Sequence, residues 1–311
     1  MNRREFLQIA GSTLGTIFLP QITVPSTYLS ERLGCQIEGD VATIKKWLVP
    51  GRIYQIPIKW RDIEPTPGTY VWPEIYDNNV SLLASYPFII TIKVCPEWAR
   101  LWPDVGSPVS SLCYNSLSNF ICAIQERYNP EAIELFNEPD VKRKDGKDVG
   151  EYFGSWVDDN ETYYQGGQRY GQCVSSLQNL GVKMLYGALS MHDQSLEFLR
   201  GAKDSGLNTG AISFHCNIWR ADQFGRAFEL ARKIKNIVDL PVVMTETTVI
   251  GEEDSLMLMD TQKDYLKFLR RNYSEIDSIN WYAFNSEWKN NDLIRNNYPT
   301  PVYEEFINGN N

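Results

Sequence analysis

The stretch Ala132-Ile133-Glu134-Leu135-Phe136-Asn137-Glu138-Pro139 decides how this chain folds. Its largely apolar first part is typical of a buried strand, and Pro139 ends the strand because it has no backbone N–H to donate. A proline also favours an extended backbone in the residue before it, so we expect the Glu138 carboxyl to project from the strand end. The alternative is a turn that carries a solvated glutamate.

A second glutamate stands at the end of another apolar run, Pro241-Val242-Val243-Met244-Thr245-Glu246. The two acids are 246 − 138 = 108 residues apart, about the length of three successive strand-helix units in an eight-stranded parallel barrel. By itself Glu246 is either a solvated strand cap or a functional group. Because the strand ends of such a barrel share one face, we expect Glu138 and Glu246 to meet in one cleft.

Short apolar runs alternate with amphipathic segments along most of the chain, which predicts parallel strands with helices outside them. No glycine-rich nucleotide motif follows any of these runs. We therefore predict an α/β fold, a single-domain (β/α)8 TIM barrel over residues 31–311. The eight predicted strands are Leu33 to Glu38, Ile53 to Lys59, Phe88 to Cys95, Ala132 to Asn137, Val182 to Ala188, Ala211 to His215, Val242 to Glu246 and Ser278 to Phe284.

Length and charge limit the classes of partner. The chain has 311 residues and 43% hydrophobic content, enough for one large core. A net charge of −9 disfavours nucleic acid and anionic membranes, because both would repel this surface, whereas a neutral polysaccharide or oligosaccharide remains compatible. The two histidines, His192 and His215, form no metal motif. We expect no metal, no cofactor and a monomer.

Residues 1–30 resemble a twin-arginine export signal with its linker, because Arg3-Arg4 precedes the uncharged stretch Gln8 to Leu19. This resemblance predicts export to the periplasm or the extracellular space, without stable membrane insertion after processing. A short amphipathic helix is the alternative, and the sequence shows no clear cleavage site. Cys95 and Cys113 flank one predicted loop, and the sequence leaves open whether they form a disulfide.

The stretch Trp60-Arg61-Asp62-Ile63-Glu64-Pro65-Thr66-Pro67-Gly68-Thr69-Tyr70-Val71-Trp72 resembles a W-x-x-x-E-P-x-x-G-x-Y-x-W segment of several glycoside hydrolase families. With Asn137-Glu138-Pro139 and Glu246, it makes the chain similar to the retaining (β/α)8 glycoside hydrolases of clan A. Cys95-Pro96-Glu97-Trp98-Ala99 and Arg127-Tyr128 look most like the xylosidase-like and exopolysaccharide-hydrolase members of family 39.

This resemblance implies a role for each motif residue. Glu138 is the implied general acid/base, Glu246 the nucleophile and Asn137 the donor to the sugar 2-hydroxyl. His215 resembles a residue that orients the nucleophile, although many relatives carry a tyrosine at the position of Asn217. A buried histidine with a structural partner is the alternative.

Several tryptophans are candidates for sugar binding, because an indole face suits the apolar face of a sugar ring. Trp281 resembles the tryptophan that floors the subsite next to the nucleophile. Trp60, Trp98 and Trp156 follow predicted strands, so they are candidates for the walls of the cleft. The sequence does not separate these from aromatic residues that cover the core.

The function predicted from these features is retaining hydrolysis of O-glycosidic bonds, with β linkages expected, in an extracellular or cell-wall polysaccharide. Three alternatives stay open: a transglycosylase that uses the same glutamates, a non-catalytic polysaccharide-binding barrel, and a Schiff-base aldolase with Lys59 or Lys93 as nucleophile. The sequence does not decide the sugar, the linkage, or endo versus exo action.

Overall fold

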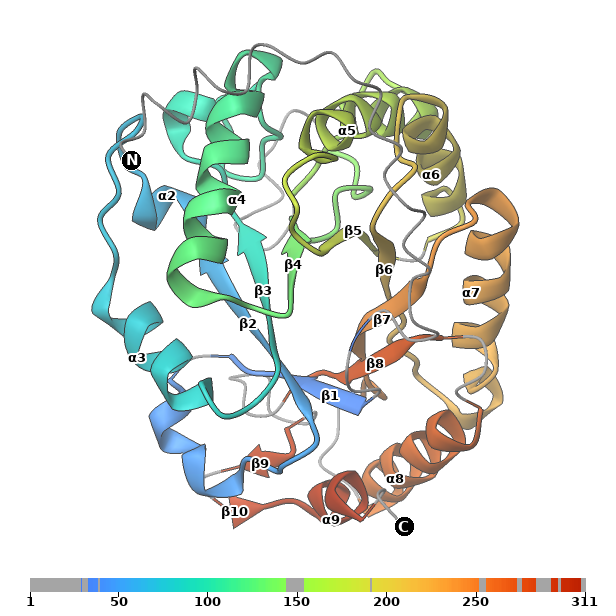
Figure 1. The fold of residues 1–311 in the computed structure, drawn as a ribbon. Coiled ribbons are helices and arrows are strands. Elements are labelled where there is room, and N and C mark those ends of the chain that lie inside the picture. The colour runs from blue at the N-terminus through green and yellow to red at the C-terminus, as the bar shows by residue number, and fades with distance from the viewer. Residues whose placement is uncertain are drawn as a thin grey trace, which may run out of the picture.

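The computed structural model describes residues 29, 33–38, 40–143, 154–190, 192–251, 256–272, 276–283, 292–295 and 298–308. Eight parallel strands pair in chain order, and β1 pairs with β8, so the sheet closes into a barrel (Figure 1). The predicted (β/α)8 barrel is therefore confirmed. The predicted export signal falls almost entirely outside the described residues and stays a prediction.

The strands lie close to the predicted runs. They are β1 (Leu33–Gln36), β2 (Ile53–Lys59), β3 (Phe88–Lys93), β4 (Ala132–Leu135), β5 (Met184–Leu189), β6 (Ala211–His215), β7 (Val242–Thr247) and β8 (Ser278–Trp281). A short antiparallel pair, β9 (Ile294–Arg295) and β10 (Tyr298–Pro299), follows the barrel.

Helices surround the barrel (Figure 1). The main ones are α3 (Glu74–Leu83), α4 (Tyr114–Tyr128), α5 (Tyr163–Leu177), α6 (Ser195–Asp204), α7 (Arg226–Ile237), α8 (Leu256–Arg271) and α9 (Pro301–Ile307). The segment after β1 is short and forms only two 3-10 turns, η1 (Val41–Thr43) and η2 (Lys45–Trp47). The remaining short elements are α2 (Trp60–Ile63), η3 (Glu97–Ala99), η4 (Ser111–Cys113) and η5 (Ala221–Gln223).

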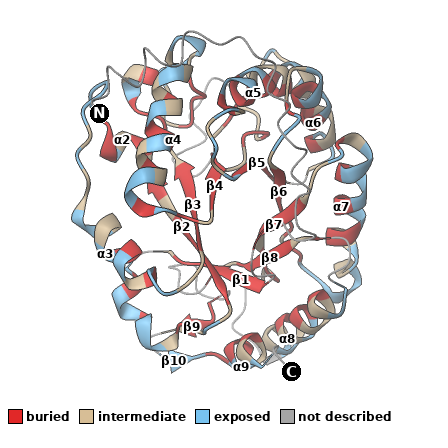
Figure 2. Cartoon of the chain, viewed as in Figure 1, coloured by how far each residue is buried: buried red, intermediate tan, exposed pale blue. Residues whose placement is uncertain are grey.

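The eight strands of the barrel are largely buried, as Figure 2 shows, because helices cover one face and the barrel interior the other. Alternate residues face the helices and form the large outer core, to which Ile133 and Leu135 of β4 belong. The residues between them face the barrel axis. An inner apolar cluster fills the barrel near the amino ends of the strands and consists of Leu29, Ile53, Ile89, Ala132, Leu185, Ala211 and Val243.

One step further along the strands, the barrel interior is polar. Gln55 Nε2 donates to Thr91 Oγ1 and to Glu134 Oε2, both at 2.8 Å, and Thr91 donates to the same Glu134 oxygen at 2.9 Å. Asn280 Nδ2 donates to Gln55 Oε1 at 2.7 Å. We call Gln55, Thr91, Glu134 and Asn280 the inner polar layer. It separates the inner apolar cluster from the carboxyl ends of the strands.

The structure also bears on a disulfide between Cys95 and Cys113 and on helices that could cross a membrane. All six cysteines have free thiols, so Cys95 and Cys113 are not bridged in this structure. Among the described helices, none is both long and apolar enough to cross a membrane.

Candidate active site

Glu138 leaves β4 through an unusual backbone. Phe136 and Glu138 have φ values of +64° and +48°, in the left-handed region that non-glycine residues rarely adopt. The predicted extended conformation of Glu138 is therefore wrong, and the strand ends at Leu135 instead of Asn137. The backbone stays anchored because Phe136 N–H donates to Ile92 O at 3.0 Å and Glu138 N–H donates to Ala188 O at 3.2 Å. Such conformations cost about 1 to 3 kcal/mol each and often occur at functional sites.

Glu246 reaches the same end of the barrel by a different route. Val243 faces the barrel axis and Met244 faces the helices, so strict alternation would turn Glu246 outward. The pairing between β6 and β7 shifts here, from Phe214 opposite Met244 to His215 opposite Glu246. This irregularity places Glu246 beside the inward-facing His215, as bulges next to active sites commonly do.

The structure brings Glu138, His215 and Glu246 together. One ligand-type atom from each lies within 4.8 Å of the other two. His215 Nδ1 is hydrogen-bonded to Glu138 Oε1 at 2.8 Å and lies 3.8 Å from Glu246 Oε2. The glutamate side chains each keep 15% of their surface exposed, whereas His215 keeps only 3%. The two acids are thus close neighbours, with a buried imidazole beside them.

The environment favours a proton on this group of side chains. Burial raises the pKa of Glu138, and the charges of Glu246 and Asp140 raise it further, while the hydrogen bond from His215 acts in the opposite direction. Burial by itself lowers the pKa of His215, but the carboxylates of Glu246, Glu138 and Glu134 overcome it and raise that pKa to about 9. Near neutral pH, His215 is therefore a cation and Glu138 holds its proton more tightly than an ordinary glutamate.

Glu246 has a separate partner that sequence reasoning did not identify. Asn217 Nδ2 donates to Glu246 Oε1 at 2.7 Å. Asn217 stands where many relatives of the resembled families carry a tyrosine, and here its amide supplies the hydrogen bond. His215, in contrast, is closer to Glu138 than to Glu246.

Asp140 fixes the loop that carries Glu138. Its buried carboxylate accepts hydrogen bonds from Ser190 N at 2.9 Å and from the hydroxyl of Ser195. His192 Nε2 lies 3.0 Å from the Asp140 carbonyl oxygen. The chain after Glu138 is thereby tied to the segment between β5 and α6. Asn137 lies half-buried beside it, and its predicted contact with a sugar hydroxyl stays a prediction.

The tryptophan motif after β2 is structural. Trp60 is fully buried in α2, where its indole N–H donates to Glu64 Oε2 at 2.6 Å and its ring stacks on Phe120. Gly68 N–H donates to the other Glu64 oxygen at 2.7 Å, which closes the loop. The predicted role of Trp60 in the cleft is therefore wrong, because no face of its ring is free for a sugar. Trp98 is half-buried, packs edge-on against Trp60, and remains a candidate.

Trp156 and Trp281 are also corrections, since both are fully buried. Trp156 packs edge-on against Tyr170 of α5. Trp281 belongs to the outer core and its ring contacts Tyr265 of α8, because Asn280 occupies the inward position and strand neighbours alternate.

Trp219 is an aromatic residue that sequence reasoning did not select. It lies two positions after Asn217 and is 57% exposed. The preceding residue, Ile218, extends the pairing of β6 with β7 through hydrogen bonds with Thr248 and Ile250. This short extension holds an exposed indole close in sequence to the partner of Glu246. A search for aromatic residues just after the sixth strand could have found it.

Glu138, His215 and Glu246 are also the group of described residues best placed to hold a metal ion. The hydrogen bond between His215 and Glu138 instead fits acid-base chemistry, in which a proton is shared between a carboxyl and an imidazole. The expectation that the protein needs no metal or cofactor stays a prediction.

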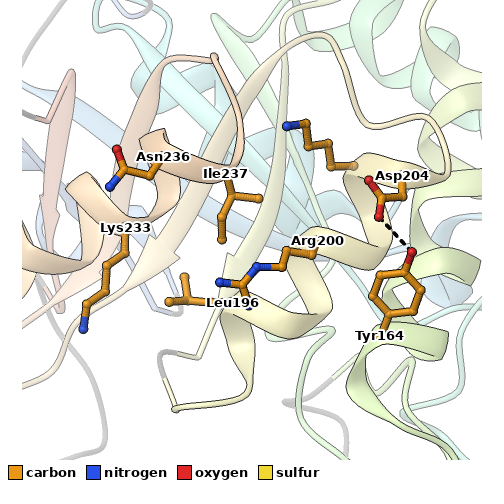
Figure 3. A pocket seen from close by; sticks show the side chains of 8 residues that line it. Tyr164, Leu196, Arg200, Asp204, Lys233, Asn236 and Ile237 are labelled. Atoms are coloured by element: carbon orange, nitrogen blue, oxygen red, sulfur yellow. Dashed lines mark hydrogen bonds between the residues drawn. The ribbon is translucent and has the colours of Figure 1, made fainter.

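A separate cavity of about 590 Å³ lies on the helix side of the barrel, among α5, α6 and α7 (Figure 3). Its wall includes Arg200, Lys203 and Lys233, and Tyr164 donates to Asp204 Oδ2 at 2.8 Å. None of the residues that line it belongs to a strand end, so this cavity is distinct from the site that contains the two glutamates.

No protein-family model matches the sequence, and no curated protein matches it either. Solved structures nevertheless share the fold. A family 39 glycoside hydrolase from the gut symbiont Bacteroides cellulosilyticus WH2 superposes with a TM-score of 0.61 at 15% identity, covering 91% of this chain and 64% of that one. The present chain thus spans less than two thirds of that protein.

Two further neighbours cover more of their own length. A family 39 β-xylosidase from Caulobacter crescentus gives a TM-score of 0.63 at 14% identity, covering 90% of this chain and 70% of that one. A family 128 endo-β-1,3-glucanase from Amycolatopsis mediterranei, in complex with laminaritriose, gives 0.55 at 14% identity, covering 89% of this chain and 99% of that one. At these identities, the comparisons establish a shared barrel fold.

Proposed function

We propose that this protein is a retaining glycosidase that cleaves β-linked glycosidic bonds in a polysaccharide or oligosaccharide. One observation carries the proposal: carboxylate oxygens of Glu138 and Glu246 lie within 4.8 Å of each other at the carboxyl end of a closed barrel. Retaining enzymes hold their two carboxyl groups about 5 to 5.5 Å apart, whereas inverting enzymes need about 6.5 to 9.5 Å to admit a water molecule.

The surroundings of the two acids support distinct roles. Glu138 has a raised pKa and can protonate the leaving oxygen. Glu246 accepts a hydrogen bond from the neutral amide of Asn217 and can attack the anomeric carbon. When Glu246 becomes a neutral ester, its charge no longer raises the pKa of Glu138. Glu138 can then remove a proton from the water that completes hydrolysis.

The substrate class follows from the fold neighbours and from the exposed aromatic side chain. The neighbours named as a β-xylosidase and an endo-β-1,3-glucanase both act on β-linked sugars. The exposed indole of Trp219, two positions after the partner of Glu246 in the sequence, offers a face for a sugar ring. We include in the proposal that residues 1–30 direct export, so that the substrate is extracellular or part of the cell wall.

The decisive experiment replaces the proposed nucleophile. Glu246→Ala should reduce turnover of a β-configured aryl glycoside by at least about 10⁴-fold, because no covalent intermediate can form. Sodium azide should restore turnover in this variant and yield the α-glycosyl azide, since azide enters the space left by the carboxylate. A panel of β-linked polysaccharides and aryl glycosides identifies the substrate first.

The result separates this function from its alternatives. Undiminished activity in Glu246→Ala would remove Glu246 from the nucleophile role. An active wild-type protein that transfers sugar to added alcohols faster than to water would be a transglycosylase. A protein that binds polysaccharide but cleaves no member of the panel would be a binding barrel.

A further inference from the structure

The barrel interior directly beneath the acid pair holds a charged residue with an incomplete set of hydrogen bonds. Glu134 is completely buried in the inner polar layer, and its Oε2 atom accepts from Gln55 and Thr91. Its other oxygen, Oε1, is buried and has no hydrogen-bond partner in the described part of the chain. A buried carboxylate oxygen without a donor costs several kcal/mol, so a missing donor is expected.

A matching donor is present in the same interior. His215 lies at an inward position of β6, and its Nδ1 atom is bonded to Glu138. Its Nε2 atom is buried and also has no partner among the described residues. An imidazolium carries a proton on both nitrogens, so Nε2 needs an acceptor while Glu134 Oε1 needs a donor.

The two atoms are too far apart for a direct bond, because the described residues show neither a hydrogen bond nor an ion pair between Glu134 and His215. Asn280 Oδ1 from β8 is a third buried atom without a partner in the described interior. Buried water molecules make about three hydrogen bonds to polar groups of this kind.

We propose that a buried water cluster links His215 Nε2 to Glu134 Oε1 inside the barrel, and that Glu134 is thereby a positioning residue for the acid/base Glu138. The water accepts from the imidazolium and donates to Glu134. Glu134 acts through His215 and does not touch the substrate. The role of Glu134 in positioning the acid/base rests on the proposed glycosidase function. The water link between His215 and Glu134 does not depend on that function.

The electrostatic surroundings agree with this arrangement. The charged groups that act on His215 are Glu246, Glu138 and Glu134, and all three carboxylates favour the imidazolium. Glu134 is the member of this set that is completely buried, whereas Glu138 and Glu246 are each 15% exposed. Removal of its charge should weaken proton binding by His215 without changing any group that contacts the substrate.

The test uses Glu134→Gln, which keeps the side-chain shape but removes the charge. The chain has only two histidines, so ¹⁵N-histidine NMR resolves His215 once His192→Gln has assigned the other signal. We expect the titration midpoint of His215 to fall by about one pH unit in Glu134→Gln. Glu126→Gln, which removes the same charge from an exposed position on α4, should leave the midpoint unchanged. An unchanged midpoint in Glu134→Gln would overturn the proposal.

Two further measurements keep the proposal testable. The first applies if Glu134→Gln fails to fold, and the second separates positioning of Glu138 from a purely structural effect. A high-resolution crystal structure of the unsubstituted protein should show water within hydrogen-bonding distance of Glu134 Oε1 and His215 Nε2, and a dry interior would refute the link. In the active enzyme, the basic limb of the pH profile of kcat/KM should move to lower pH in Glu134→Gln, by the same amount as the NMR midpoint. The NMR titration needs no substrate, so lack of glycosidase activity would count only against the proposed function.

Discussion

Glu138 and Glu246 lie side by side at the carboxyl end of the barrel, but the ends of β4 and β7 position them differently. The end of β4 uses two left-handed residues, whereas the end of β7 uses a shift in strand pairing. Both side chains are 15% exposed, so access to water does not distinguish them. Their hydrogen-bond partners do: the His215 imidazole bonds to Glu138 and lies 3.8 Å from Glu246, whose hydrogen bond comes from the neutral Asn217 amide. These different surroundings fit the proposed roles of Glu138 as the proton donor and Glu246 as the nucleophile.

Removal of the carboxyl from β4 should produce the largest difference between the two ends. Glu138→Ala should lower the rate of hydrolysis of a substrate with a poor leaving group by about 10² to 10⁴-fold, because the glycosidic oxygen of such a group departs only when it is protonated. A 4-nitrophenyl glycoside, whose leaving group needs no proton, should form the glycosyl-enzyme at nearly the wild-type rate. Single-turnover kinetics would measure both rates.

The products formed with azide distinguish the roles of the two glutamates. With Glu138→Ala, azide attacks a glycosyl-enzyme that still forms on Glu246, so the product should be the β-azide. With Glu246→Ala, the expected product is the α-azide. The same anomer from both variants would contradict the assignment of different roles to the two strand ends. NMR spectroscopy of the isolated azides identifies the anomer.

A smaller effect is expected when the partner of Glu246 is removed. Asn217→Ala deletes one hydrogen bond to a carboxylate, worth about 1.5 to 3 kcal/mol, so kcat should fall by roughly 10 to 100-fold. The pH dependence of kcat/KM should change little, because the amide does not titrate. His215→Gln should instead move the basic limb, since His215 is the ionisable partner of Glu138. A shift of the basic limb in Asn217→Ala but not in His215→Gln would contradict the assignment of His215 as the partner of Glu138 and of Asn217 as the partner of Glu246.

The smallest effect concerns stability. His215 has a pKa of about 9 in the folded protein against an ordinary value of 6.5, so folding strengthens its proton binding. The corresponding stabilisation is complete below pH 6.5 and is lost as the pH rises through 9. Urea unfolding between pH 6 and pH 10 should show this decline in the wild type and a weaker one in His215→Gln. The matched control, His192→Gln, should decline as the wild type does.

The sequence predicted most of the fold because the barrel strands are short apolar runs with regular spacing. It located β2 and β6 at the residues that the structure shows, and it placed Glu138 and Glu246 at strand ends. These successes depend on local features: hydrophobic period, a proline stop and the distance between two acids along the chain.

The errors arose where the direction of a side chain depended on its neighbours. Trp60, Trp156 and Trp281 follow or end strands, yet all three point into packed cores. The burial of Trp281 follows from the register of β8, which no single residue reveals. The left-handed backbone of Glu138 likewise contradicts the local preference before proline, because Ala188 and the Asp140 anchor hold the loop from another strand.

By itself, the amino-acid sequence determined that this protein is a (β/α)8 barrel with glutamates at the ends of its fourth and seventh strands, because periodicity and proline stops act over a few residues. Tertiary structure alone decided that His215 contacts Glu138, that Asn217 contacts Glu246, and that one Glu134 oxygen beneath them has no partner among the described residues. Those contacts join separate strands of the closed barrel, and they depend on register, bulges and closure, which are properties of the packed chain.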